Sequence, residues 1–310
     1  MKLLSLVFSF KNEEKNLREL IERTARVLKE IQNWNYELIF VNDNSSDNSQ
    51  KIILELQKDH PITLINLSRT FGRIPSVIAG FRKTKGNVVI YMDTDLQDPP
   101  EIIPEMLEKY EQGSEIVHTI RTRRLGESSL KMVITKFAYR IINFFSDIPL
   151  EVNAGDFKLI SRKALDKILE QKEFKPYVRG LSVWVGFKQS IVKYVRQPRY
   201  SGETKYPLFS FGPISEFVIG ITSYSNKPLF ISILFSVLSI LISFFLVIYA
   251  LYAKFSGIAV PGTTSVIIAI SFFSSIILFS IGLTGIYIAR IFDQTKGRDQ
   301  YVIKDIFEKE

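Results

Sequence analysis

Cysteine is absent from the 310-residue chain, and histidine occurs only at His60 and His118. The absence of cysteine excludes disulfides, a thiolate zinc site and a cysteine nucleophile. With two histidines, a Ser-His-Asp triad or a multi-histidine metal site is not expected either. The G-x-G-x-x-G and G-x-x-x-x-G-K-[ST] phosphate loops are also missing. The chemistry must therefore come from carboxylates, basic groups, hydroxyls and the backbone.

Charge is missing from two long segments near the C-terminus, although the chain carries a formal charge of +8. Residues 229–253 and 266–289 contain no charged side chain. At 1.5 Å per residue, either segment would span roughly 36 Å as a helix, enough to cross a hydrocarbon core of about 30 Å. Helices of a soluble core rarely run so long without a charge. The sequence therefore predicts two transmembrane helices.

Basic residues are unevenly distributed around these two segments. The connector between them contains Lys254 as its one basic residue, and the segment after them contains Arg290, Lys296, Arg298, Lys304 and Lys309. Under the positive-inside rule, the C-terminal tail and the large N-terminal region are expected in the cytoplasm. The first ten residues lack a small-residue cleavage site, so a strand is expected there rather than a signal peptide.

Strand-like and helix-like patterns alternate over the first 120 residues. The apolar runs that predict strands are 3–10, 36–41, 62–67, 88–92 and 115–119. Strands separated by helices predict an α/β domain with a mostly parallel sheet and helices on both faces. Ligands of such sheets bind beyond the carboxyl ends of the strands. Two polar clusters, 42–47 and 93–98, fall at such ends.

Two further segments, 128–148 and 209–224, are amphipathic and rich in aromatic residues. Helices of this kind are typical of a membrane interface, with ordinary packing on the sheet as the alternative. The expected organisation has four parts: a catalytic domain over 1–208, an interfacial helix over 209–226, two transmembrane helices with a short connector over 227–290, and a cytoplasmic tail over 291–310.

Three carboxylates, Asp93, Asp95 and Asp98, follow the strand-like run Val-Val-Ile-Tyr within six positions. Anions this close repel one another unless a cation lies among them. Hard oxygen ligands suit Mg²⁺ or Mn²⁺, and the expected ligands are Asp93, Asp95 and the amide oxygen of Gln97. The alternative is a solvated turn in which Asp98 caps the next helix.

The stretch MDTDLQDPPE resembles the M-D-A-D-L-Q-D-P-P-E of family 2 glycosyltransferases that load sugars onto polyprenyl phosphates. Bactoprenol glucosyltransferases and dolichyl-phosphate mannose synthases belong to this group. The resemblance continues through FVNDNSSDNS, LSRTFGRIPSVIAG, NAGDFKLISR, RGLSVWVGFKQ and YVRQPRYSGETKYPL, and covers residues 3–208. It implies a GT-A-type, Rossmann-like sheet. Departures from the family pattern are Ser9, Lys11, Asn44 and Thr94, which replace Pro, Tyr, Gly and Ala.

The resemblance implies roles for particular residues. The residues implied to bind the nucleotide-sugar donor are Ser9, Glu13, Asp43, Asp93, Thr94 and Asp95. The catalytic base would be Asp156, although a phosphate acceptor with a second pKa near 6 is mostly dianionic at neutral pH and hardly needs deprotonation. Asp156 is therefore expected to position the acceptor or to take a residual proton. The lipid phosphate and the diphosphate would be bound by basic residues, namely Arg121, Lys131, Arg199 and Lys205.

The implied reaction is an inverting, metal-dependent transfer of a hexose onto undecaprenyl or another polyprenyl phosphate. UDP-glucose is the favoured donor, glucose is the transferred sugar, and the product is β-linked. The implied place is the cytoplasmic leaflet of a bacterial-type inner or plasma membrane, where the protein would be integral. The expected partners are a UDP-sugar, the lipid phosphate, the membrane and Mg²⁺ or Mn²⁺. No nucleic acid is expected, and a homo-oligomer is left open.

Two other functions are considered. A processive polysaccharide synthase would carry a Q-x-x-R-W motif, but Leu181-Ser182-Val183-Trp184 lacks its Gln and Arg, and two spans are few for a polymer channel. A non-catalytic membrane anchor that binds a nucleotide sugar is the second. The presence of Asp93, Asp95 and Asp156 argues against it.

Overall fold

The computed structural model describes residues 1–124, 129–148, 154–174, 176–198, 200–201, 211–257 and 262–309. It divides into two compact units. The first comprises Met1–Gly220 and Arg298–Glu310, and the second comprises Ile221–Gly297. The chain thus leaves the first unit once and returns to it at its C-terminal end.

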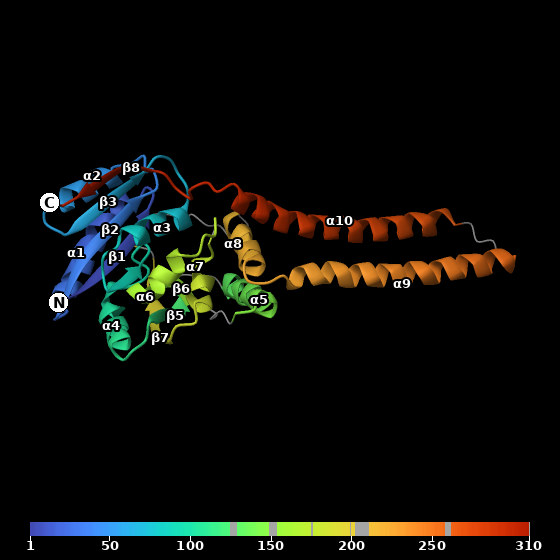
Figure 1. Cartoon of the computed structure of the whole chain (residues 1–310), viewed down its shortest axis with the longest axis horizontal. Coiled ribbons are helices and arrows are strands. Elements are labelled where there is room, and N and C mark those ends of the chain that lie inside the picture. Colours follow the sequence, from blue (N-terminus) through green and yellow to red (C-terminus); the bar gives the residue numbers. More distant parts are fainter. Residues whose placement is uncertain are drawn as a thin grey trace. The chain divides into compact units, whose positions relative to one another are not determined.

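An eight-stranded sheet forms the centre of the first unit, in the order β7-β5-β6-β4-β1-β2-β3-β8 (Figure 1). The strands are β1 Lys2–Phe10, β2 Trp34–Asn42, β3 Ile62–Leu67, β4 Val88–Tyr91, β5 Ile116–Arg124, β6 Ala154–Ser161, β7 Gln189–Arg196 and β8 Ile303–Glu308. Strands β4, β1, β2 and β3 run parallel, as do β5 and β7. Strand β6 is antiparallel to β4 and β5, and β8 is antiparallel to β3. The predicted mostly parallel sheet is confirmed.

Helices join the strands and cover both faces of the sheet. Those that begin in the first unit are α1 Glu14–Glu30, α2 Ser49–Leu56, α3 Arg73–Lys83, η1 Pro100–Ile102, α4 Ile103–Glu111, α5 Ser129–Phe145, α6 Arg162–Leu169, α7 Val178–Trp184 and α8 Phe211–Thr222. On one face, Leu4, Leu6 and Phe8 of β1 join a core with apolar residues of α1 and α4. On the other face, a Cβ at Gly80 would clash with Val7, so α3 lies close against the sheet. Strands buried on both faces explain the continuous apolar runs of the sequence.

Strand β8 is an edge strand that the sequence analysis did not anticipate within the tail 291–310. It pairs antiparallel with β3, and the Ser68 N–H donates to the Val302 carbonyl at 2.9 Å just beyond the paired segment. Its side chains are exposed and many are charged, as is common for edge strands that must not pair with other chains. The chain segments before and after the second unit are therefore parts of one sheet.

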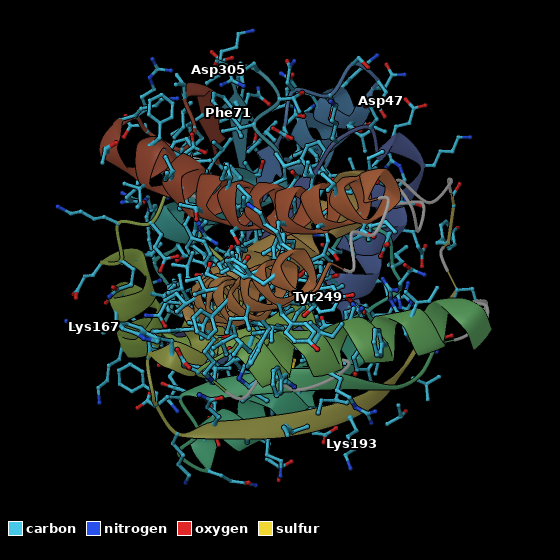
Figure 2. All side chains as sticks on the ribbon, turned by 90° about the vertical axis from the view of Figure 1, so that its right-hand side faces the viewer. Asp47, Phe71, Lys167, Lys193, Tyr249 and Asp305 are labelled. Atoms are coloured by element: carbon cyan, nitrogen blue, oxygen red, sulfur yellow. The ribbon has the colours of Figure 1, made fainter. Side chains whose placement is uncertain are left out.

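The second unit contains the helices α9 Lys227–Phe255 and α10 Thr263–Thr295. Both are long and apolar enough to cross a membrane, by length and composition. Large apolar and aromatic side chains on them are exposed, Tyr249 among them (Figure 2). Polar contacts gather near one end of the pair, where Arg290 donates to Thr222 Oγ1 at 2.6 Å and to Ser223 Oγ at 3.0 Å. The two predicted apolar helices are confirmed.

Candidate functional site

Polar residues converge where β1, β2 and β4 end, because these parallel strands share one carboxyl edge. The Asp43 N–H donates to the Phe10 carbonyl at 2.9 Å, which ties the end of β2 to the end of β1. Glu13 is buried just beyond β1, and its carboxylate accepts a hydrogen bond from Asn16 Nδ2 at 2.6 Å. The predicted donor residues of these two strand ends thus lie on one rim of the sheet.

The carboxylate of Asp43 is held by backbone amides. It accepts from the N–H of Phe71 at 2.7 Å and from the N–H of Gly72 at 3.0 Å. Gly72 has φ 99°, a left-handed conformation that favours glycine. Asp43 therefore fixes the turn that leads into α3. This turn lies at the rim where the nucleotide-sugar donor is expected to bind.

Asp93 is joined to Ser9 through the buried Tyr91. The Tyr91 hydroxyl donates to Asp93 Oδ1 at 2.7 Å and lies 3.3 Å from Ser9 Oγ. Burial, together with the charge of Asp93, raises the pKa of Tyr91 well above its ordinary value. The phenol therefore stays protonated and orients the Asp93 carboxylate.

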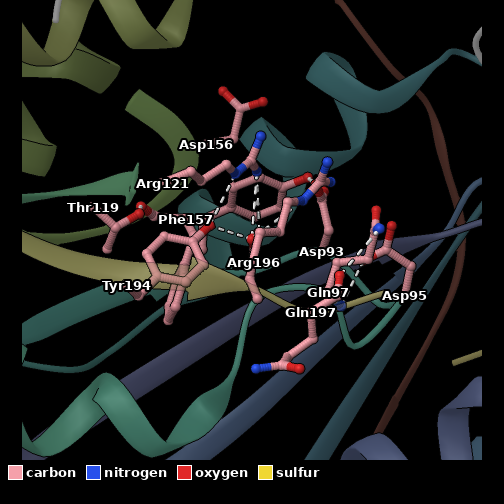
Figure 3. A network of polar contacts seen from close by, with 12 residues as sticks. Asp93, Asp95, Gln97, Thr119, Arg121, Asp156, Phe157, Tyr194, Arg196 and Gln197 are labelled. Atoms are coloured by element: carbon pink, nitrogen blue, oxygen red, sulfur yellow. Dashed lines mark hydrogen bonds and ion pairs between the residues drawn. The ribbon is translucent and has the colours of Figure 1, made fainter. Parts of the chain in front are cut away.

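The second half of the motif is a tight turn. Asp95 Oδ1 accepts from the Gln97 N–H at 3.1 Å, and Leu96 between them has φ 57°. The Gln97 side chain donates to the Gln197 carbonyl at 3.4 Å, so its oxygen is directed away from that contact (Figure 3). Thr94 is buried. This turn keeps Asp93, Asp95 and Gln97 within one short segment at the rim.

Asp98, the third carboxylate, has basic partners instead of capping a helix. Its side chain is fully buried and forms ion pairs with Arg121 Nη2 at 3.4 Å and Arg196 Nε at 3.8 Å. The Tyr194 hydroxyl donates to Asp98, and Arg121 Nε donates to that hydroxyl oxygen at 2.9 Å (Figure 3). Although burial acts in the opposite direction, the charge of Asp98 raises the pKa of Arg121. Two buried guanidiniums thus explain why the chain tolerates a third aspartate here.

The predicted lipid-phosphate residue Arg121 belongs to this Asp98 cluster. Its guanidinium lies against Gly155, where a Cβ would come within 3.0 Å of Nη2. Gly155 and Asp156 are neighbours on β6, so their side-chain directions alternate. Figure 3 accordingly shows the Asp156 carboxylate turned away from Tyr194 and Arg196. The structure therefore does not bring Arg121 and Asp156 onto one face of the sheet.

Other predicted basic residues lie outside the described residues. Arg199 and Lys205 fall in segments that the structure does not describe, and only the backbone of Lys131, in α5, is described. Their assignments stay predictions.

Asp156 is a buried carboxylate between two arginines. Arg179 donates to it twice, from Nε to Oδ1 and from Nη2 to Oδ2, both at 2.7 Å, and Arg73 Nη1 forms an ion pair with Oδ2. Burial acts to raise the pKa of Asp156, but Arg179 and Arg73 lower it well below its ordinary value. Asp156 is therefore a permanent anion at neutral pH and a weak proton acceptor. The geometry suits a residue that holds two guanidiniums in place.

A cavity of about 420 Å³ lies beside Arg179 and is lined by His118, Tyr139, Lys158, Tyr177 and Trp184, among others. Lys158 Nζ donates to Ser182 Oγ at 3.0 Å, and burial lowers the pKa of Lys158 to about 8. His118 is bonded to Gln189 at 2.9 Å. Burial, together with the charge of Lys158, lowers the pKa of His118 to about 4, so its ring is neutral.

Sequence reasoning placed no role on Arg73, Lys158 or His118. One signal was present for Lys158: its spacing of two from Asp156 on a strand puts both side chains on one face. No comparable signal links Arg73 or Arg179 to Asp156, because those contacts join distant segments.

A family model described as Glycosyl transferase family 2 matches residues 5–169. The glycosyltransferase YkcC of Bacillus subtilis is 40% identical over 302 residues, which cover 97% of this chain and 93% of that protein. The prophage bactoprenol glucosyl transferase homolog of Escherichia coli is 33% identical over 308 residues, which cover 98% of this chain and 99% of that protein. Both alignments extend along nearly the whole chain.

A solved structure, that of S. aureus TarS in complex with UDP-GlcNAc, aligns over 71% of this chain and 65% of that chain with 17% identity and a TM-score of 0.48. The sequence relatives are the stronger comparison, since they extend along nearly the whole chain.

Proposed function

The chain belongs to glycosyl transferase family 2, and we propose that it transfers a hexose from a nucleotide diphosphate sugar to a polyprenyl phosphate. The observation that carries this proposal is 33% identity, nearly end to end, to a protein named for bactoprenol glucosyl transfer. The two long apolar helices support it, because they would hold the enzyme at the membrane where such an acceptor lies.

We propose UDP-glucose as the donor, bound along the carboxyl rim of the sheet. Ser9, Glu13 and Asp43 lie at the strand ends where a nucleotide is expected in this type of sheet. Thr94, buried inside the Asp93–Asp95 turn, would support the backbone there. The sugar diphosphate would then extend toward Asp93 and Asp95.

The same turn fits a divalent cation. Asp93 and Asp95 offer carboxylates and Gln97 an amide oxygen, which are the hard oxygen ligands of Mg²⁺ and Mn²⁺. Among the described residues, no group of three or more acidic or histidine side chains could hold a metal by itself. Diphosphate oxygens are therefore expected to complete the coordination. When bound, the ion would stabilise the charge that develops on the leaving UDP.

The proposed chemistry is a single displacement. A phosphate oxygen of the acceptor forms a bond to C1 of the sugar, the bond from C1 to the diphosphate oxygen breaks, and UDP leaves with the electron pair. Inversion at C1 converts an α-linked donor into a β-linked product. A dianionic acceptor has no proton to lose, which agrees with the depressed pKa of Asp156. Asp156 is proposed to position the acceptor through its two arginines.

The return of β8 to the sheet supports the proposed membrane topology. Residues before α9 and after α10 belong to one folded unit, so they must lie on the same side of a membrane. Two crossings satisfy this condition, and the basic residues of the tail favour the cytoplasmic side. We propose α5 and α8 as interfacial helices and residues 1–208 as the catalytic domain.

The test is transfer of radiolabelled glucose from UDP-glucose by the full-length protein in detergent, with and without undecaprenyl phosphate. A lipid-extractable product that needs both the lipid phosphate and a divalent cation is expected. A water-soluble polymer instead would favour the processive synthase. Donor binding without transfer to any acceptor or water would favour the non-catalytic anchor.

A further inference from the structure

Strand β8 contacts β3 up to the point where β3 leads into the donor rim. The two strands pair antiparallel from Thr63 to Leu67, and the Ser68 N–H donates to the Val302 carbonyl at 2.9 Å. In the strand order, β3 has β2 on one side and β8 on the other (Figure 1). Strand β8 therefore supplies the hydrogen-bond partners for the outer edge of β3.

The loop after β2 is held by the end of β3. Asn66 of β3 is buried, and its Oδ1 accepts from Asn42 Nδ2 at 3.0 Å. Asn42 Oδ1 in turn accepts from the Ser45 N–H at 2.8 Å. Asn66 is paired with Asp305 of β8. The pairing with β8 therefore helps to place the residue that holds the loop 42–47.

The turn after β3 is held from the same strand. Ser68, whose N–H is bonded to the tail, is the first residue of this turn. Two later amides of the turn, those of Phe71 and Gly72, donate to the Asp43 carboxylate. A shift of the Ser68 bond would therefore move the amides that fix Asp43 at the donor rim.

Two side-chain contacts also attach the tail to the first unit. Lys83 at the end of α3 pairs with Glu308 of β8. Gln300 Nε2 donates to the Glu173 carbonyl, between α6 and α7, at 2.6 Å. A partly exposed ion pair such as that of Lys83 contributes little by itself. The backbone pairing with β3 therefore carries most of the attachment.

Strand β8 follows the two long apolar helices along the chain, whereas β1 to β7 precede them. If both helices span a membrane, as proposed, β8 reaches β3 because the second crossing returns the tail to the side of the sheet. A chain with one crossing would leave β8 on the opposite side and the edge of β3 without this partner. The donor rim would then lose the support described above.

We propose that β8 is a positioning element of the donor site, which binds the nucleotide sugar tightly only when the tail has completed the sheet. This inference rests on the proposed function and goes beyond it, because it couples donor binding to the return of the chain from the membrane. An enzyme with one inserted helix then binds its donor weakly.

The test breaks the pairing in the full-length protein with the double variant Asp305→Pro/Ile306→Pro. Neighbouring residues of an antiparallel strand direct their N–H groups alternately toward and away from the partner strand. One of the two prolines therefore removes a hydrogen bond to β3. The matched control is Asp305→Ala/Ile306→Ala, which removes the same exposed side chains but keeps both N–H groups.

Donor affinity is measured by calorimetry in detergent with Mn²⁺. The wild type is first titrated with UDP-glucose, UDP-N-acetylglucosamine and GDP-mannose, and the ligand that binds most tightly is used for the variants. The proline variant should bind it at least about tenfold more weakly, which is the scale of one or two backbone hydrogen bonds. The alanine variant should differ from the wild type by less than about twofold.

Steady-state kinetics separate positioning of the donor site from a general loss of structure. In the proline variant, KM for the donor should rise at least about tenfold. At saturating donor, kcat and KM for farnesyl phosphate should change less than about twofold. Equal rises in KM for the donor and for farnesyl phosphate would overturn the specific role of β8 at the donor site.

Hydrogen exchange tests the same coupling in the unmodified protein. Coupling is reciprocal, so a donor that prefers the paired strand must stabilise the pairing by the same factor. Saturating nucleotide sugar should slow amide exchange in β3 and β8 about tenfold, whereas exchange in α6 should change less than about twofold.

The outcomes distinguish this inference from the proposed function. Unchanged donor affinity in a folded proline variant, or equal exchange of β8 with and without donor, would overturn the inference and leave sugar transfer intact. Should the proline variant fail to fold, the exchange measurement on the wild type decides the question. A wild type that binds none of the three nucleotide sugars would refute the proposed function, and the inference with it.

Discussion

Replacing Asp98 by asparagine removes a buried negative charge that pairs with two arginines. The Asp98 side chain is 0% exposed, and those of Arg121 and Arg196 are 11% and 15% exposed. An amide can still accept the Tyr194 hydroxyl bond, but it cannot neutralise a guanidinium. Removing one partner of a buried ion pair costs about 3–5 kcal/mol because the other charge stays buried. We therefore expect Asp98→Asn to destabilise the first unit strongly.

The measurement is thermal unfolding of the full-length protein in detergent, followed by intrinsic fluorescence. For a unit of this size, 1 kcal/mol corresponds to about 2–4 °C, so Tm should fall by about 6–20 °C. The matched control is Glu101→Gln in the same segment. Glu101 pairs with Arg23 at 2.6 Å, but their side chains are 48% and 28% exposed. Loss of a pair this accessible to water is expected to cost less than about 1 kcal/mol.

A double variant separates charge balance from packing. In the double variant Asp98→Asn/Arg121→Met, one of the cations that paired with Asp98 is also removed. Its Tm should therefore be higher than that of Asp98→Asn alone. If Asp98→Asn lowers Tm no more than Glu101→Gln does, the charge-balance account is wrong. If Tm is unchanged but stimulation by Mg²⁺ or Mn²⁺ disappears, Asp98 is a third metal ligand.

The remaining predictions concern the site and the edge of the sheet. Asp95→Asn should abolish stimulation of transfer by Mg²⁺ or Mn²⁺ at an unchanged Tm. If the variant responds to these ions as the wild type does, Asp95 is not a metal ligand. Asp156→Ala should lower kcat by about 100-fold or more with little change in UDP-glucose affinity, because the acceptor-side arginines lose their anchor; equal losses in both would place Asp156 at the donor. As the pH is lowered, kcat/KM for the acceptor should fall with a midpoint near about pH 6, where the acceptor phosphate gains a proton. A midpoint at a different pH would show that another group titrates. Deleting 298–310 should expose the edge of β3 and promote aggregation, measured by light scattering, and a monodisperse product would show that β8 does not protect it.

Short apolar runs in the sequence were sufficient to predict the first four strands of the sheet. The apolar runs that became β1, β2, β3 and β4, and the rim at their carboxyl ends, follow from strand length and from the intervening helices. Strand β8 was missed because its six residues are all exposed and carry several charges, which is typical of an edge strand and leaves no apolar run in the sequence. Its pairing with β3 is a contact between distant parts of the chain.

The site was predictable in its residue types but not in its pairings. The three carboxylates of residues 93–98 look alike in sequence. Asp98 nevertheless pairs with arginines of β5 and β7, whereas Asp93 accepts from Tyr91. Likewise, strand alternation groups Asp156 with Lys158, but the arginines that lower the pKa of Asp156 come from α3 and α7. Charge balance in the interior is decided by tertiary contacts, which no spacing in the sequence encodes.

In the proposed reaction the main difficulty is charge repulsion rather than proton removal. A phosphate dianion must approach a sugar diphosphate that also carries about two negative charges. At a separation of about 5 Å and an effective dielectric constant of about 20, two dianions repel each other by roughly 13 kcal/mol. Among the described residues, Arg73, Arg179 and Lys158 would place three cations on the proposed acceptor side of this contact, and the carboxylate of Asp156 pairs with both arginines. Without Asp156, the two guanidiniums would lose the anion that fixes their positions before substrate arrives. With it, the two guanidiniums stay in place to offset the repulsion, so an acidic residue of low pKa would support the proposed transfer without acting as a base.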